Sequence, residues 1–365
     1  MKNIMFYMGH PAHFHLFRHA IHRLYANGHR IQILIKTKDI LETLVRDEGF
    51  EYKNILPEGR KDNKPSILLG MLKRDVQLYK ECRRERPDLL VGTSVENSHI
   101  SKLLSIPCIN VNEDDAAAVP LYAKLSYPWA TTILTPVSCD CGRWDHKAIK
   151  YQGYHELGYL HPNHFTPSRE VVRQYFNPDE RYFILRFAKL AAHHDAGVRG
   201  IESRVAHEIL KILQPLGKVY ITSERELEPE LEQFRLNIKL LDIHHVLAFA
   251  SFYIGDSQTM AAESAVLGTP FLRFNDFVGR LGYLAQLEDK YQLGYGIKPE
   301  ESHRLLELTE KMANTPNLHE IYQERRRRML EEKIDVAAFL TWFIEGYPES
   351  EEIMKENPAY QYKFR

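Results

Sequence analysis

The sequence lacks the features that mark secreted, membrane-spanning or nucleic-acid-binding proteins. Its 365 residues include only four cysteines, at the irregularly spaced positions 82, 108, 139 and 141, which argues against a disulfide framework and favours a reducing cytoplasm. No apolar run approaches the roughly 20 residues of a bilayer-spanning helix, and the N-terminus has no signal-peptide pattern. The net charge of −1 gives no global argument for nucleic acid or an anionic membrane. We therefore expect a cytoplasmic protein whose only membrane contact would be peripheral, at the inner face.

Several catalytic motifs are also missing. The chain has no GxxxxGK[ST] phosphate loop, no GxSxG elbow and no zinc-finger spacing. Cys139 and Cys141 form a lone pair of thiols, and no metal site is expected from them. These absences argue against kinase, hydrolase and nucleic-acid-binding functions. We expect neither a metal nor a cofactor.

Short apolar runs do occur, and they alternate with helical patterns. This alternation is typical of parallel βαβ units, and 365 residues suit two domains. The first half predicts strands over 3–8, 30–36, 89–93, 107–112 and 131–136. A stretch rich in Gly, Pro, His and Tyr, 153–167, reads as an interdomain connection, after which strands are expected at 181–187, 218–223, 238–241, 251–255 and 270–274. The sequence thus predicts an α/β fold with two Rossmann-like domains.

The most informative stretch is GDSQTMAAESAVLGTPFLR, residues 255–273. It predicts a strand end, a helix with Asp256 or Ser257 as its N-cap and its end at Gly268, and another strand. The start of such a helix favours a phosphate group. Glu263 lies on an otherwise apolar helix, where a carboxylate is costly without a partner. About 9 Å of helix rise separates it from Ser257, comparable with the reach from a nucleotide's pyrophosphate to its ribose. The alternative is a core ion pair with Arg273 or another basic residue.

This stretch resembles the donor-binding segment of GT-B nucleotide-sugar enzymes, above all the UDP-N-acetylglucosamine 2-epimerases, whose pattern is roughly DSGGxQEExxxLGxP. The matching residues are Asp256, Ser257, Glu263, Leu267, Gly268 and Pro270, whereas Gln258 and Thr259 replace the two glycines and Ala262 replaces the first glutamate. Over the whole chain the closest resemblance is to the family DUF354, on the stretches 10–17, 86–92, 186–194 and 242–270. The substitutions count against a standard epimerase more than against the GT-B fold.

The resemblance implies two Rossmann-like domains with parallel sheets facing a central cleft. We expect an N-terminal acceptor-side domain at residues 1–160 and a nucleotide-sugar-binding domain at 161–334. A C-terminal helical segment, 335–365, would return to the first domain. Ligands of such sheets bind beyond the carboxyl ends of the strands, so the loops that follow the strands are searched for site residues.

Two loops of the first domain carry candidate catalytic residues. GHPAHFH, 9–15, offers His13 or His15 as a general base for the acceptor hydroxyl. A metal site there lacks nearby carboxylate or cysteine companions. The other alternative is a purely structural role, in which His10 caps the strand and His13 or His15 begins the helix. NEDDAAA, 112–118, offers Glu113 or Asp114 for proton transfer of the epimerase kind. A helix N-terminus with acidic caps explains that loop equally well.

In the second domain, RFAKLAAHH follows a predicted strand at the place where GT-B enzymes hold the donor pyrophosphate. Arg186, Lys189 and His194 are the candidates, since Arg suits bidentate phosphate recognition. His244, in DIHHVLAFA, lies in the region that would contact a uracil. Together with Ser257, Gln258, Thr259 and Glu263, these residues form the expected donor site.

The leading expectation is a metal-independent GT-B-like glycosyltransferase that uses a UDP-sugar in cell-surface polysaccharide or glycolipid synthesis. Its partners would be the nucleotide-sugar donor and a sugar or lipid-linked acceptor, with no nucleic acid. One alternative is an enzyme like UDP-N-acetylglucosamine 2-epimerase, and another is a non-catalytic nucleotide-sugar-binding protein. The run ERRRRM, 324–329, is most simply a solvated helix face, although its arginines could contact acidic lipid.

Overall fold

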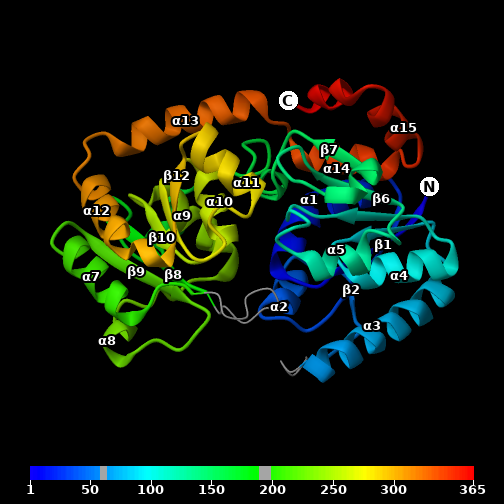
Figure 1. Ribbon diagram of the computed structural model, residues 1–365, viewed down its shortest axis with the longest axis horizontal. Coiled ribbons are helices and arrows are strands. Elements are labelled where there is room, and N and C mark those ends of the chain that lie inside the picture. The colour runs from blue at the N-terminus through cyan, green and yellow to red at the C-terminus, as the bar shows by residue number, and fades with distance from the viewer. Residues whose placement is uncertain (58–63, 189–198) are drawn as a thin grey trace. The chain divides into compact units, whose positions relative to one another are not determined.

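Each half of the chain is built around its own parallel sheet, as Figure 1 shows. The computed structural model describes residues 1–57, 64–188 and 199–365. Unit 1 consists of Met1–His161 together with Lys333–Arg365, and unit 2 of Pro162–Glu332. The predicted α/β class with two Rossmann-like units is confirmed.

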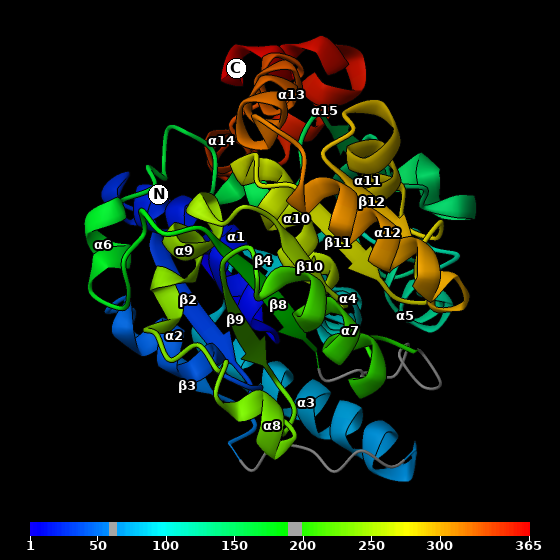
Figure 2. The same ribbon diagram turned by 90° about the vertical axis from the view of Figure 1, so that its left-hand side faces the viewer.

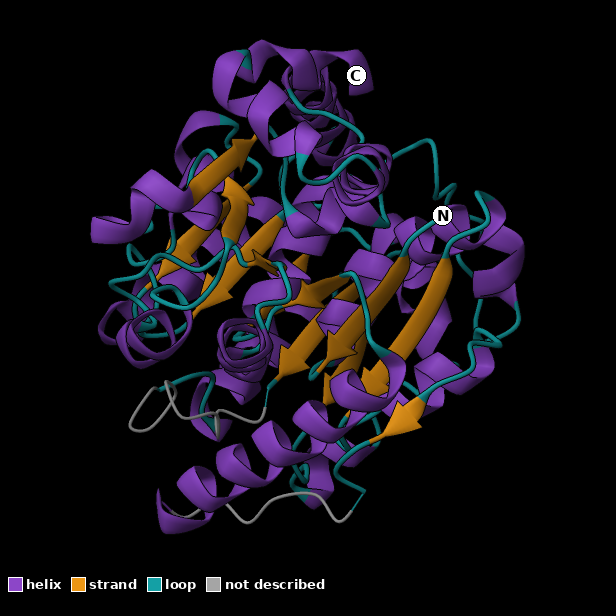
Figure 3. Cartoon of the chain, turned by 90° about the vertical axis from the view of Figure 1, so that its right-hand side faces the viewer, coloured by secondary structure: helices purple, strands orange, loops and turns teal. Residues whose placement is uncertain are grey.

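Among the described residues, the sheet of unit 1 has seven strands in the order β3-β2-β1-β4-β5-β6-β7. Neighbouring strands pair in parallel, and Figure 3 shows them side by side with their arrowheads at one edge. Their bounds are β1 Asn3–Met8, β2 Arg30–Ile35, β3 Lys53–Asn54, β4 Leu89–Gly92, β5 Cys108–Val111, β6 Thr132–Pro136 and β7 Ala148–Tyr151. The strand order reverses between β1 and β4, and sheets of this kind bind ligands beyond the carboxyl ends of strands at such a switch point.

Helices connect these strands. They are α1 Pro11–Ala26, α2 Leu41–Asp47, α3 Lys64–Glu85, α4 Val95–Leu104 and α5 Pro120–Ser126. The chain direction reverses after β3, so right-handed crossovers place α3, α4 and α5 on the sheet face opposite α1 and α2. Strands such as β1 are buried along nearly their whole length, which is expected of a parallel sheet covered on both faces.

Unit 2 has a five-stranded parallel sheet in the order β12-β11-β10-β8-β9 within the described residues. The strands are β8 Tyr182–Phe187, β9 Lys218–Ser223, β10 Tyr253–Gly255, β11 Phe271–Phe274 and β12 Gly294–Ile297. The helices are α6 Arg169–Arg173, α7 Ser203–Leu213, α8 Pro229–Glu232, α9 Ile243–Phe249, α10 Gln258–Leu267, α11 Gly282–Ala285, α12 Ser302–Ala313 and α13 Leu318–Glu332. Helix α9 packs against α10 and α7 against α12, on opposite faces of the sheet (Figure 2).

The C-terminal segment of unit 1 follows α13. It forms α14 Val336–Glu345, α15 Glu349–Glu356 and a final 3-10 turn, Pro358–Phe364. Helix α14 contacts α1, and its apolar side chains Phe339, Leu340, Phe343 and Ile344 are buried. Lys2 Nζ donates to the carbonyl of Glu345 at 2.7 Å, and Thr132 Oγ1 lies 3.0 Å from Tyr347 Oη. The end of the chain therefore belongs to the core of the unit that its beginning forms.

Candidate functional site

The helix predicted from residue 257 is present in unit 2 as α10. Strand β10 ends at Gly255, and Ser257 caps the helix by accepting a hydrogen bond from Met260 N at 3.3 Å. Ser257, Gln258 and Thr259 are half-buried in this cap and first turn, whereas the helix from Met260 onward is buried. Gly268 ends it with φ of 77°, a left-handed conformation that glycine adopts readily. The unsatisfied N–H groups of a helix start thus lie directly after a strand of the sheet.

Asp256 connects this helix start to the loop that follows β8. Its buried carboxylate accepts hydrogen bonds from Ala188 N at 2.6 Å and from Ile201 N at 3.3 Å. Its backbone carbonyl accepts from Asn275 Nδ2 at 2.9 Å. Burial raises the pKa of Asp256 to about 6, against the effect of these backbone N–H donors. One side chain therefore fixes both stems of the predicted phosphate-binding loop beside Ser257.

The basic residues predicted in that loop are only partly described. Lys189 and His194 lie outside the described residues. Arg186, at the end of β8, forms an ion pair with Glu224, which follows β9. Gly255 leaves room for the stem of Arg186, since a Cβ there would lie 2.8 Å from Arg186 Cβ. The arginine is thus at the carboxyl edge of the sheet, as expected, but a carboxylate already contacts it.

Glu263 has a basic partner, although not the one named from the sequence. Its Oε1 lies 2.9 Å from His244 Nε2, and both side chains are buried. Arg273 instead pairs with Glu288, at 2.7 Å and 3.0 Å from its Oε1. Two residues expected at the donor site therefore contact each other directly. The alternative of a core ion pair with Arg273 or another basic residue holds with His244 as the basic residue, and Arg273 is not the partner.

In unit 1, the first predicted loop brings His13 to the carboxyl edge of β1. His10 is the N-cap of α1, where its Nδ1 accepts from Ala12 N at 3.2 Å, so this histidine has a structural role but caps the helix rather than the strand. His13 Nδ1 accepts from Gly9 N at 3.1 Å, and Thr93 Oγ1, after β4, lies 2.6 Å from His13 Nε2. The pair bridges the switch point of the sheet. Burial, followed by the neighbouring His10, holds the pKa of His13 well below its usual value.

His15 and Asp114 are two further catalytic candidates of unit 1. The buried ring of His15 lies within α1, 5.1 Å from the ring of Tyr159. Asp114 is half-buried, and its carbonyl accepts from Asn112 Nδ2 at 2.9 Å. The helix-cap explanation of the acidic loop is wrong, because α5 begins only at Pro120 and Val119 caps it without a side-chain bond.

Glu113 contacts a histidine that the sequence analysis did not single out. His155 Nδ1 lies 3.3 Å from Glu113 Oε1, and His155 N donates to Oε2 at 3.0 Å. The side chains are only 12% and 14% exposed. Burial lowers the pKa of His155 to about 3, whereas burial and the nearby Glu156 raise the pKa of Glu113. Within the described part of the chain, His155 Nε2 is buried without a hydrogen-bond partner. A neutral ring with its proton on Nδ1, the nitrogen that faces Glu113, keeps a lone pair on Nε2.

The signal that could have revealed His155 is its position after a strand. It follows β7, but that strand was not predicted, and 153–167 resembled a linker because it has no hydrophobic period. Cys139, part of the CxC pair, donates its thiol to the carbonyl of Glu113 at 2.9 Å and so supports the acidic loop. Its role in the described structure is therefore a hydrogen bond.

Two Rossmann-like units with a helix start beside a strand-end loop define the GT-B class of fold, and solved structures share it. The S. aureus MnaA structure with UDP has a TM-score of 0.67 at 12% identity, covering 96% of this chain and 98% of that one. The Neisseria meningitidis UDP-GlcNAc 2-epimerase bound to UDP-GlcNAc gives 0.57 at 14%, covering 91% and 99%. The spinosyn rhamnosyltransferase SpnG with thymidine diphosphate gives 0.62 at 12%, covering 93% and 99%. At these identities the likeness shows the fold.

The chain belongs to the family described as "Protein of unknown function (DUF354)", whose model matches residues 3–276. No curated protein matches the sequence. In the part of the chain that the structure describes, no helix is both long and apolar enough to cross a bilayer.

Proposed function

We propose that this protein is a glycosyltransferase that binds a UDP-sugar in unit 2 and transfers the sugar to an acceptor hydroxyl. The observation that carries the proposal is Asp256, which ties both stems of the loop after β8 to the start of α10. In the proposal, the first turn of α10 at Ser257, Gln258 and Thr259 holds the diphosphate. Arg186, Lys189 and His194 add positive charge to it.

Glu263 and His244 would hold the nucleoside. Their contact places a carboxylate next to an imidazole within one buried pair. We propose that Glu263 accepts hydrogen bonds from the ribose hydroxyls while His244 orients it and lies near the base. Hydrogen bonds to a charged acceptor of this kind are worth about 1.5–3 kcal/mol each. The proposal thus gives Glu263 both roles expected from the sequence. It is a donor-site residue, and it is a buried carboxylate with a basic partner.

The bond that breaks joins the sugar's anomeric carbon to a phosphate oxygen, and the nucleoside diphosphate leaves with negative charge. Backbone N–H groups at the start of α10 and the guanidinium of Arg186 would stabilise this charge. This assistance comes from the chain itself, and we propose no metal or cofactor for it.

The incoming acceptor oxygen must lose a proton, and His155 is the base that we propose. A carboxylate at Nδ1 and a lone pair on Nε2 form the arrangement by which acid–base histidines are oriented. His13, predicted from the sequence together with His15, would position the acceptor hydroxyl instead, because its Nδ1 already accepts from Gly9 N. Transfer within the cytoplasm, toward cell-surface polysaccharide or glycolipid, remains the proposed setting.

A UDP-N-acetylglucosamine 2-epimerase-like activity is the second candidate, and Glu113 is the observation that favours it. Its raised pKa would suit a group that both takes up and returns a proton. The replacement of the two glycines by Gln258 and Thr259 speaks for the transferase.

The decisive experiment follows UDP-N-acetylglucosamine by NMR with the purified protein, with and without a panel of sugar and lipid-linked acceptors. UDP release that requires an acceptor supports transfer. An epimer, or UDP released without acceptor, supports the epimerase. Bound donor without turnover supports a non-catalytic binding protein, and absence of UDP binding contradicts all three.

The base is tested in the same assay with His155→Gln. We expect turnover to fall at least about 100-fold, the usual range for a general base, with UDP affinity unchanged. His146→Gln, an exposed histidine of the same unit, is the matched control. A larger loss of turnover in His13→Gln than in His155→Gln would identify His13, in the loop after β1, as the base.

A further inference from the structure

Helix α3 of unit 1 exposes an apolar stripe to solvent. Leu72, Val76 and Tyr79 are 50%, 52% and 36% exposed. Spacings of four and three residues place them on one face of the helix. The opposite face is buried, with Leu78 and Cys82 in the core cluster beside β1 and β4. An exposed apolar row on a helix that already has its buried face calls for a partner or a medium that covers it.

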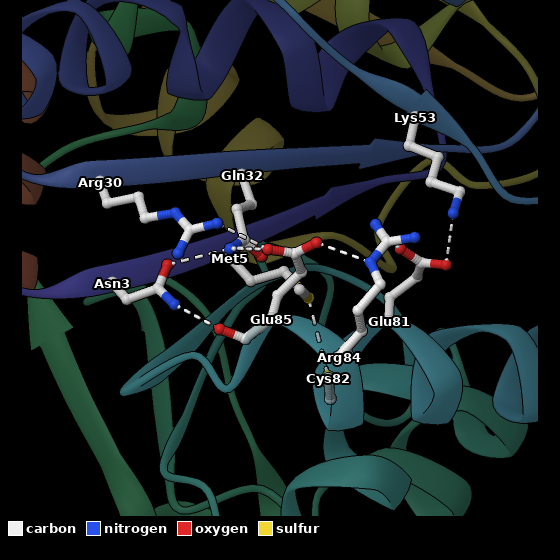
Figure 4. A network of polar contacts seen from close by, with 9 residues as sticks. All are labelled: Asn3, Met5, Arg30, Gln32, Lys53, Glu81, Cys82, Arg84 and Glu85. Carbon is white, nitrogen blue, oxygen red and sulfur yellow. Dashed lines mark hydrogen bonds and ion pairs between the residues drawn. The ribbon is translucent and has the colours of Figure 1, made fainter.

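Each acidic side chain of α3 is held by a basic partner beside the helix, including Asp75, which lies three residues after Leu72 and four before Tyr79. Glu81 pairs with Lys53 at 2.6 Å, and Glu85 pairs with Arg30 at 2.7 Å, as Figure 4 shows. Asp75 pairs with His99 on α4 at 3.1 Å. The negative charge of the helix is thus compensated on its flank and inner side.

Cations border the stripe instead. Lys73, Lys80 and Arg83 are exposed. Arg83 continues the stripe one turn beyond Tyr79, and Lys73 and Lys80 follow its flank two turns apart. Among the described side chains, neither Lys80 nor Arg83 forms an ion pair with a carboxylate. An apolar row with a basic border and a tyrosine is the pattern of a helix that lies in the interface of an anionic bilayer.

We infer that α3 docks unit 1 on an anionic phospholipid surface, with Leu72 and Val76 inserted at the boundary of the acyl chains and with Lys80 and Arg83 among the headgroups. This inference goes beyond the proposed function and does not depend on it. A second copy of the chain fits the face less well, since a twofold contact would bring this basic border against itself.

The basic run of α13, which the sequence suggested for acidic lipid, is occupied within unit 2. Arg325 donates to the carbonyl of Gln292 and Arg326 to that of Val266, each at 2.6 Å. Arg327 pairs with Glu324 and Glu331. Helix α13 therefore supplies a matched control: it exposes Ile321 and Arg328 but has its acidic residues on the same exposed face.

The test is cosedimentation of the full chain, without nucleotide, with vesicles of phosphatidylcholine alone or of equimolar phosphatidylcholine and phosphatidylglycerol. We expect binding only to the anionic vesicles, weakened by salt. Lys80→Gln/Arg83→Gln should lower the partition coefficient at least about 10-fold, given about 1 kcal/mol per cation. Leu72→Ser/Val76→Ser should lower it as much, and Ile321→Ser/Arg328→Gln should leave it unchanged. All six positions are exposed, so circular dichroism should show native folds.

Three results would overturn the inference. Equal binding to both vesicle types would show that α3 does not recognise the anionic headgroup. Full binding by Leu72→Ser/Val76→Ser would make the face a site for polyanions such as RNA. Concentration-dependent dimerisation that these two serines abolish, without vesicle binding by the wild type, would identify a second copy as the occupant.

Discussion

Buried histidines and carboxylates at the strand ends of unit 1 carry the chemistry that we propose. His155 takes its properties from two sources: burial, which disfavours its charged form, and Glu113, which orients its ring. A solvated histidine would titrate near pH 6.5, whereas His155 stays neutral to about pH 3. This difference makes its burial measurable without any substrate.

We predict that the unfolding free energy of unit 1 depends on pH through His155. Its pKa is about 3 when folded, below the value of about 6.5 expected when unfolded. The stability contributed by the neutral ring is therefore complete above about pH 6.5 and is lost as the pH falls toward about 3, with a slope of up to about 1.4 kcal/mol per pH unit. His155→Gln should remove this slope between about pH 6 and about pH 5.

Urea unfolding followed by tryptophan fluorescence measures this pH dependence of the unfolding free energy, since all three tryptophans, 129, 144 and 342, belong to unit 1. His146→Gln should keep the wild-type slope. Glu113 acts in the opposite sense through its raised pKa, so the prediction concerns the difference between variant and wild type. Identical slopes in His155→Gln and wild type would mean that the ring titrates normally.

The sequence could predict single site residues where a residue type conflicted with its surroundings. Glu263 on an apolar helix was such a conflict, and it required a partner. The sequence could not identify His244 as that partner, because the contact joins two helices whose packing depends on the tertiary structure. His155 had no conflict to reveal it, since its segment is aperiodic and its burial depends on the whole sheet edge.

At the scale of elements, helix α10 is the part of the molecule on which the donor site depends. Its cap, Ser257, and its end, Gly268, match the predicted bounds because both use local chemistry. Strand β1 likewise has the predicted range, 3–8.

The stretch 238–241 was wrongly predicted as a strand. It is apolar but leads through a 3-10 turn, Leu240–Asp242, into α9. The short edge strands β3, β7 and β12 were not predicted, since each contains a lysine or glycines that interrupt an apolar run and their pairing comes from neighbouring strands.

Substitutions of Ser257 distinguish the contribution of this residue to the stability of α10 from its contribution to the proposed binding of phosphate. Aspartate is as good an N-cap as serine and interacts favourably with the helix dipole, so Ser257→Asp should leave the melting temperature without nucleotide unchanged. The added negative charge should weaken UDP binding at least about 10-fold, equivalent to about 1.4 kcal/mol. Thermal unfolding with and without UDP measures both effects.

Ser257→Ala is the complementary variant. It should lower stability by about 1 kcal/mol through loss of the cap. If Ser257→Asp bound UDP as tightly as the wild type, the diphosphate would not lie at the start of α10.

At the scale of the whole molecule, the chain returns to unit 1 after completing unit 2. Residues 333–365 bury Phe339, Leu340, Phe343 and Ile344 in unit 1. Burial of four such side chains is worth roughly 6–12 kcal/mol before entropy is counted, which is comparable with the net stability of about 5–15 kcal/mol of a typical domain.

We therefore predict that a chain truncated after Glu332 loses the folded structure of unit 1. The fluorescence of Trp129 and Trp144 should then show no cooperative urea transition. Tyr362→Ser, an exposed change in the same segment, should have no such effect. A cooperative, unshifted transition in the truncated chain would show that unit 1 is complete without its C-terminal segment.

Calorimetric titration of the whole protein with UDP shows whether unit 2 binds a UDP-sugar through α10. We expect saturable binding that Glu263→Ala weakens about 10- to 100-fold, from the loss of charge-assisted hydrogen bonds to ribose. Glu307→Ala, on the exposed face of α12, should bind as the wild type does. The absence of UDP binding, or an unchanged affinity in a folded Glu263→Ala protein, would contradict the claim.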